Sequence, residues 1–244
     1  MTSHQTSVRQ GSFELQVLVN GESIRVYAAK NGRLYVEGRP GSPYTIRLHN
    51  KSPRKVLFIP SVDGLSVIDG QPASASSGGY VVRAYGYVDL KGWRNSLDDV
   101  AQFNFSPIDK AYAAQTDQPQ NTGVIGVLVF NEKTPPVNLD HFESLTLRSK
   151  GMDSGPASFG SAATRGVRQG IGTGYGPKVV DRVNTTTFDR EDFPVTQLVV
   201  YYDDREGLVL RGISFREVPE IVVESSDQPK PFTGFCPPPP GHRD

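Results

Sequence analysis

The chain has very little cysteine, no long apolar run and no excess of charge of either sign. Its one cysteine, Cys236, excludes an internal disulfide, and a chain of 244 residues can bury a sizeable core without one. Lysine plus arginine number 26, as do aspartate plus glutamate, so no bulk field draws the protein onto nucleic acid or anionic lipid. No apolar run approaches the roughly 20 residues that a membrane-spanning helix needs. We therefore expect no nucleic-acid partner and no membrane span.

Motifs for metal, nucleotide and serine-hydrolase chemistry are missing as well. The four histidines lie far apart and form none of the spacings typical of zinc sites. Residues 170–176 are rich in glycine, but position 175 is tyrosine, which breaks the dinucleotide fingerprint, and no Walker lysine follows. Gly-x-Ser-x-Gly does not occur. The sequence therefore predicts no catalytic residue, no metal ligand and no cofactor.

Strand and turn patterns dominate what is present. Residues 56–59 and 124–130 are short, continuous apolar runs, the pattern of strands buried on both faces. Residues 13–19 and 44–49 alternate apolar and polar side chains, as strands with one face on a core do. Asn-Gly and Asp-Gly turn dipeptides separate such runs. These patterns predict a mainly β protein, an antiparallel β-sandwich or jelly-roll-like fold, with a β-hairpin extension and flexible loops.

Changes in composition divide the chain into successive parts. We expect residues 1–11 to be a disordered leader and residues 12–133 to be a self-sufficient β-sandwich domain. Residues 134–177 are expected to be a linker and a glycine-rich flexible loop, because so little apolar surface cannot offset the entropy of ordering the backbone. Residues 178–224 are predicted to form a β-hairpin extension that packs on the sandwich, with its turn at 203–207. Residues 225–244 are a proline-rich tail.

One basic cluster offers a candidate anion contact. Its members are Arg47, His49, Lys51, Arg54 and Lys55. On a strand Arg47 and His49 share the outward face, and the turn that follows adds the other cations, so a small anion or phosphate could bind there. The alternative is a solvated sheet edge that its lysines protect from aggregation, which the lack of interleaved aromatic side chains favours.

The proline-rich tail offers a candidate contact for a protein partner. Its candidate residues are Phe232, Phe235, Pro237, Pro238, Pro239 and Pro240. Consecutive prolines hold an extended rod that loses little entropy on docking, and the two phenylalanines could serve as apolar anchors. The sequence predicts that this tail docks on a neighbouring subunit or a partner; the alternative is a solubilising terminus without a partner.

These observations favour a non-enzymatic β-sandwich protein that acts by protein binding or assembly, for example as a structural subunit. The alternative is a carbohydrate- or small-ligand-binding module, or an enzyme, with a site assembled across strands. An exposed Trp93 would support a carbohydrate platform. The polar N-terminus lacks the apolar core of a signal peptide, so we expect a soluble, cytoplasmic protein. A virion component or a protein exported without a signal peptide would have the same features.

Overall fold

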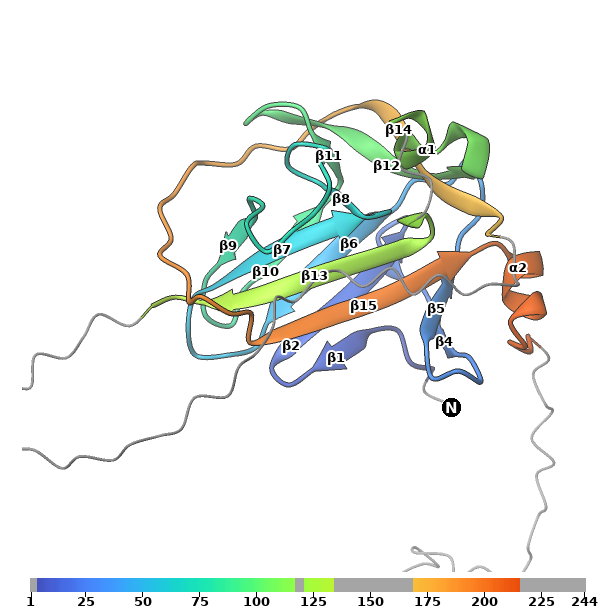
Figure 1. Cartoon of the computed structure of the whole chain (residues 1–244), viewed down its shortest axis with the longest axis horizontal. Helices are drawn as coiled ribbons and strands as arrows, with labels where there is room; N and C mark the ends of the chain where they lie inside the picture. The colour runs from blue at the N-terminus through green and yellow to red at the C-terminus, as the bar shows by residue number, and fades with distance from the viewer. Residues whose placement is uncertain (1–3, 117–120, 134–168, 216–244) are drawn as a thin grey trace, which may run out of the picture. The chain divides into compact units, whose positions relative to one another are not determined.

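Sheets and tight turns build the part of the chain that the computed structural model describes, residues 4–116, 121–133 and 169–215 (Figure 1). The chain divides into two units, residues 1–214 and 215–244, and every element named below lies in the first. Among the described residues, all strand pairs are antiparallel except one parallel pair. The predicted class, a mainly β, sandwich-like fold, is confirmed.

Sheet A has the strand order β1-β2-β6-β10, and β3 pairs with β2. Its strands are β1 (Val8–Gln10), β2 (Phe13–Val19), β3 (Glu22–Ser23), β6 (Thr45–Asn50) and β10 (Tyr87–Leu90). The alternation predicted for β6 is confirmed, since Ile46 and Leu48 are buried while Arg47 and His49 are partly exposed. Sheet A therefore has one face on the core and one face outward.

Sheet B has the order β4-β5-β15-β13-β7-β8, and β9 pairs with β7. Its strands are β4 (Val26–Ala28), β5 (Leu34–Glu37), β7 (Val56–Val62), β8 (Leu65–Ser66), β9 (Tyr80–Val82), β13 (Val124–Asn131) and β15 (Thr196–Asp203). β5 and β15 form the parallel pair. In Figure 1, β7, β13 and β15 lie in front of β2, β6 and β10 of sheet A.

Sheet C is smaller and carries the short helices. Its strands, in the order β11-β12-β14, are β11 (Gly92–Arg94), β12 (Asp99–Pro107) and β14 (Ile171–Val180). A 3-10 turn η1 (Ile108–Lys110) and helix α1 (Tyr112–Gln115) follow β12, and helix α2 (Arg205–Leu210) follows β15. The long helices that glycine and proline disfavour are absent from the described residues.

The main core lies where the three sheets meet. Its fully buried side chains include Leu48 from sheet A, Phe58 and Val127 from sheet B, and Phe103 and Phe105 from sheet C. The ring of Phe13 in sheet A meets the ring of Phe58 in sheet B edge-on, with centroids 6.0 Å apart. Such contacts across the layers bury apolar surface on both inner faces and stabilise the sandwich.

The continuous apolar runs of β7 and β13 reflect burial on both faces of sheet B, as predicted. The alternate residues Leu57, Ile59, Leu128 and Phe130 form a second buried cluster on the face away from the main core. Ile59 pairs with Leu128 and Leu57 with Phe130 across the two strands. Among the described residues, Ala75, Val81 and Phe188 pack against this cluster. Water therefore reaches neither face of these strands, and their residues need not alternate.

The hairpin predicted around residues 203–207 is wrong. β15 ends at Asp203, and the side chain of Asp204 accepts a hydrogen bond from the Gly207 N–H at 2.7 Å, which caps helix α2. Residues 208–210, predicted as strand, belong to this helix. β15 is no extension either, because it lies between β13 and β5 inside sheet B. The self-sufficiency of residues 12–133 stays a prediction.

Residues 171–176, predicted as part of a flexible loop, form the first half of strand β14, which pairs along β12. Its glycines permit close approach instead of providing flexibility. A Cβ on Gly172 would lie 2.5 Å from the Ala111 Cβ, and one on Gly176 would lie 2.1 Å from the Asn104 Nδ2. Neighbouring elements supply the burial that the segment's own side chains lack. Residues 151–168 of the predicted loop lie outside the described residues.

The leader prediction is also wrong in part, because residues 8–10 form β1, which pairs with β2. The proline-rich tail, with the six candidate partner-binding residues and Cys236, lies outside the described residues. Within the described part of the chain, no helix is long and apolar enough to cross a membrane.

Candidate functional site

The outward face of sheet A gathers polar and aromatic side chains from three strands in two cross-strand rows. One row runs Gln16, Arg47, Asp89, and the next runs Glu14, His49, Tyr87. We call these six residues, together with Tyr85 in the turn before β10, the tyrosine face. The strand period of two directs the intervening residues, such as Leu48, into the core. β2, β6 and β10 thus fix the face rigidly.

The charges of the tyrosine face are held in pairs. The Arg47 guanidinium donates two hydrogen bonds to the Asp89 carboxylate, at 2.7 Å and 2.8 Å, and lies 4.8 Å from the centroid of the Tyr87 ring. The hydrogen bond to Asp89 raises the pKa of Arg47 above its ordinary value. Burial lowers the pKa of His49 below its ordinary 6.5, so this imidazole is neutral at pH 7. Its Nε2 lies 3.3 Å from the Gln16 Oε1.

Glu14, opposite His49 on this face, forms ion pairs with two cations beside it. Burial raises the pKa of its carboxyl, but hydrogen bonds from Lys51, Ser7 and Arg9 outweigh burial and lower the pKa to about 2. Lys51 forms an ion pair with Glu14. Glu14 therefore stays ionised under all ordinary conditions.

Three of the five residues of the candidate anion contact form ion pairs with carboxylates in the folded chain. Arg47 pairs with Asp89, Lys51 with Glu14, and the Lys55 Nζ lies 2.6 Å from a Glu132 oxygen. Arg54 lies in the turn after β6, where its carbonyl accepts a hydrogen bond from Asn50 at 2.7 Å. Of the five predicted residues, Arg47 and His49 lie side by side on β6 in the face. Anion binding by this set stays a prediction.

The sequence argument missed the aromatic member of this cluster. Tyr87 lies 38 positions from His49 in the chain, yet the register of β6 and β10 places the two rings 5.4 Å apart. The polar or aromatic residues Tyr87 and Asp89 alternate with apolar residues in the sequence, which is typical of an outward row, but only strand pairing shows which cations this row joins.

Two tyrosines of this face are largely exposed. Tyr87 is 58% exposed and Tyr85 is 73% exposed. The main chain of Tyr85 is fixed, because its N–H donates to the Ser52 carbonyl at 3.2 Å. Exposed tyrosines, and an arginine stacked on one of them as Arg47 is on Tyr87, are typical of the residues that dominate protein interfaces.

Trp93 gives no support to a carbohydrate platform. It is 3% exposed, meets Phe103 edge-on at 5.3 Å, and donates its indole N–H to the Gly174 carbonyl at 3.4 Å. The ring therefore belongs to the core, and the condition for sugar stacking on it is not met.

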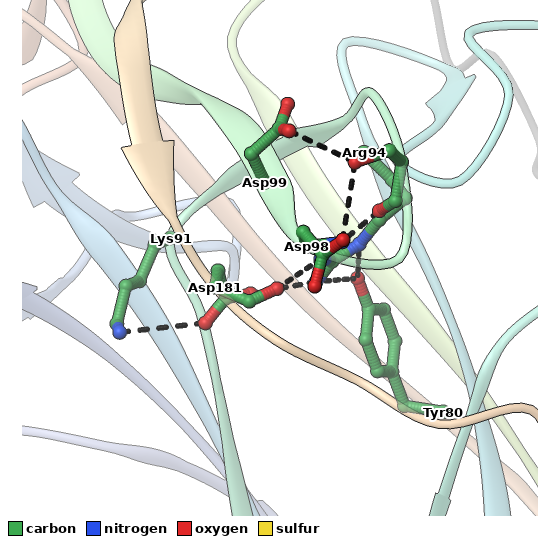
Figure 2. A network of polar contacts seen from close by, with 7 residues as sticks. Tyr80, Lys91, Arg94, Asp98, Asp99 and Asp181 are labelled. Atoms are coloured by element: carbon green, nitrogen blue, oxygen red, sulfur yellow. Dashed lines mark hydrogen bonds and ion pairs between the residues drawn. The ribbon is translucent and has the colours of Figure 1, made fainter.

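A second polar cluster centres on Arg94 (Figure 2). Its guanidinium donates to Asp181 at 2.6 Å and to the Tyr80 hydroxyl at 3.1 Å, and Lys91 lies 3.3 Å from the other Asp181 oxygen. Burial raises the pKa of Tyr80, and the hydrogen bond from Arg94 opposes this increase. The cluster ties β9 and β11 to the segment that leaves β14. The cluster therefore holds strands together, and both of its cations, Lys91 and Arg94, are paired with the Asp181 carboxylate.

A third cluster is buried completely. Asp63, in the turn between β7 and β8, accepts hydrogen bonds from the Tyr202 hydroxyl at 2.5 Å and from the N–H groups of Gly123 and Thr173, both at 2.8 Å. The Thr173 hydroxyl lies 2.6 Å from both the Tyr202 and Tyr44 hydroxyls. Burial raises the pKa of Asp63 to about 6, although these hydrogen bonds oppose the increase. Asp63 has no exposed surface, so a substrate cannot reach it.

Metal-ligand geometry is not found in the part of the chain described, where no three His, Cys, Asp or Glu side chains come together to hold an ion. Comparison of the chain with protein-family models, with curated proteins and with solved structures gave no match.

Proposed function

We propose that the protein acts by assembly, and that the tyrosine face with β10 joins two copies of the chain. The observation that carries this proposal is the exposed Tyr87 beside Arg47 on β10, the last strand of sheet A, with the exposed Tyr85 in the turn just before it. Tyrosine and arginine provide most of the energy in many interfaces, because their large planar groups bury area at a small entropic cost.

The main chain of β10 supports the same proposal. The Asn50 N–H donates to the Gly86 carbonyl, so alternate residues of β10 bond to β6, and the N–H and C=O groups of Tyr87 and Asp89 point the other way. No strand of the described chain pairs with that side of β10. A second β10, antiparallel and related by a two-fold axis, would satisfy these groups and continue the sheet.

Charge is compatible with contact between identical copies. On the face Arg47 pairs with Asp89, Glu14 pairs with Lys51 and Arg9 beside the face, and His49 is neutral. Each carboxylate of the face is paired with a cation, so two such faces would bring together no unpaired carboxylates. A partner with a strongly charged surface would gain little here, which favours a second copy over a highly basic or acidic partner.

The test is sedimentation of the full chain over a concentration series. We expect the wild type to dimerise, and Tyr87→Lys to weaken the dimer about tenfold or more, because a mobile charged side chain would replace the large planar ring at the contact. Tyr175→Lys is the matched control, since Tyr175 is 52% exposed on β14 of sheet C. Thermal melts would verify that both variants fold.

Two results would count against the proposal. A wild type that stays monomeric at every concentration would refute assembly, and a dimer that Tyr87→Lys leaves intact would refute the tyrosine face. In the second case, deletion of residues 226–244 tests the predicted docking of the proline-rich tail. Loss of the dimer in that variant alone would move the contact to the tail.

A further inference from the structure

A separate cavity of about 320 Å³ lies between the β2–β3 turn, β4 and the loop after β5. This volume is at the lower end of small-molecule sites, which begin at roughly 300 Å³. In this turn Asn20 and Gly21 have positive φ angles of 54° and 83°, the conformation that a two-residue hairpin requires. The cavity is distinct from the tyrosine face, and none of the tyrosine-face residues lines it.

Two cationic and two anionic side chains line the cavity, and Arg205, which holds Glu37 from helix α2 outside the lining, adds one further cation. Arg25, Arg39, Glu22 and Glu37 line it, and the Arg205 guanidinium holds Glu37 with two hydrogen bonds of 3.1 Å and 3.2 Å. The four lining charges and Arg205 together carry a net charge of +1. Glu37 is thereby neutralised, so it does not repel an incoming anion.

Arg25 is the cation without a carboxylate. Its guanidinium lies 5.0 Å from the centroid of the Tyr27 ring, and it forms no ion pair with any part of the chain that the structure describes. A guanidinium presents several N–H donors in a fixed plane, which matches the two oxygens of a carboxylate or phosphate group. Because Tyr27 holds one face of this group, its donor edges are left for a ligand.

Two serine hydroxyl groups line the same cavity as Arg25. Ser23 and Ser42 are both half-buried and line the wall, and their hydroxyls form no hydrogen bond to other described residues. Half-buried hydroxyls without a protein partner are satisfied by water or by a ligand. They supply further donors to a ligand in this cavity.

We infer that this cavity binds a small organic oxyanion, with Arg25 as the principal contact, Ser23 and Ser42 as additional donors, and the Tyr27 ring against the rest of the ligand. This site is independent of the assembly proposed above. Its recognition chemistry is common to carboxylates and phosphates, so the experiment must separate these two sources.

The test is titration of the full ¹⁵N-labelled chain at low salt with inorganic phosphate and, separately, with citrate, followed by amide chemical shifts. We expect saturable shifts at residues 23–25 and 42 for at least one of these anions, and the tighter of the two identifies the class. Arg25→Gln should weaken that binding about tenfold, because it removes a charge-assisted hydrogen-bonding group. Arg182→Gln is the matched control, because Arg182 is 82% exposed and distant from the cavity in the sequence.

Arg25→Lys separates charge from geometry: it should retain the charge yet bind more weakly than the wild type. Should Arg25→Gln fail to fold, Ser42→Ala tests the same contact, and it should weaken binding as well. Shifts that are not saturable, or that Arg25→Gln and Arg182→Gln reduce equally, would overturn the inference, as would the absence of shifts with both anions.

Discussion

The buried Asp63 carboxyl should make the free energy of unfolding depend on pH, and the size of this effect follows from the structure. This carboxyl is fully buried, and burial raises its pKa from the ordinary 3.8 to about 6. Each pKa unit corresponds to about 1.4 kcal/mol, so the shift amounts to about 3 kcal/mol of pH-dependent stability. The native state binds the proton more tightly than the unfolded state does. The contribution of Asp63 is therefore present in full below pH 3.8 and is lost as the pH rises to about 6.

The assay compares the wild type with Asp63→Asn, which cannot titrate at this position. Urea unfolding at a series of pH values can be followed by the fluorescence of Trp93, the only tryptophan, which is buried. We expect the free energy of unfolding of the wild type, minus that of the variant, to fall by about 3 kcal/mol from pH 3.8 to above pH 6. Taking the difference cancels the opposite effect of Glu14, whose lowered pKa makes stability fall as the pH falls.

Asp69→Asn is the matched control, because Asp69 precedes a glycine in an exposed turn just as Asp63 precedes one in a buried turn. Its difference from the wild type should not follow the same curve. The reasoning would be refuted if the Asp63→Asn difference were flat or rose with pH. That result would mean that the hydrogen bonds from Tyr202, Thr173 and Gly123 outweigh the cost of burial.

Two further substitutions test how the sheets are joined. Arg94→Met should lower the free energy of unfolding by about 2 kcal/mol, because it removes the buried guanidinium that bonds Asp181 and Tyr80 and leaves Asp181 with Lys91 alone. Arg182→Met, at an exposed site, should leave urea unfolding unchanged. Gly79→Ala should lower the melting temperature by several degrees, because the new Cβ would lie 2.1 Å from the Phe58 carbonyl oxygen. Gly78→Ala is the control: its Cβ would lie 3.5 Å from the nearest atom, on the Ile68 side chain, so this variant should melt like the wild type. Equal melting temperatures for both alanine variants would contradict the close strand contact.

Sequence alone determined the features that depend on neighbouring residues. The alternation along β2 and β6, the apolar runs of β7 and β13 and the Asn20-Gly21 turn each report a local conformation, since a strand directs side chains to alternate faces and a left-handed turn requires glycine or asparagine. These local signals were enough to predict a mainly β sandwich. One further local signal was overlooked: Asp204, followed by Arg205 and Glu206, indicates the start of a helix.

The tertiary structure decided whatever depends on pairing between distant segments. Residues 171–176 lack the side chains that would mark a buried strand, and their burial comes from β12 and α1. Tyr87 joins Arg47 and His49 only through the register of β10 on β6, and Arg25 meets Ser42 in one cavity only because the β2–β3 turn folds beside the loop after β5. No local pattern encodes these contacts, because each arises when strands far apart in the chain choose their partners.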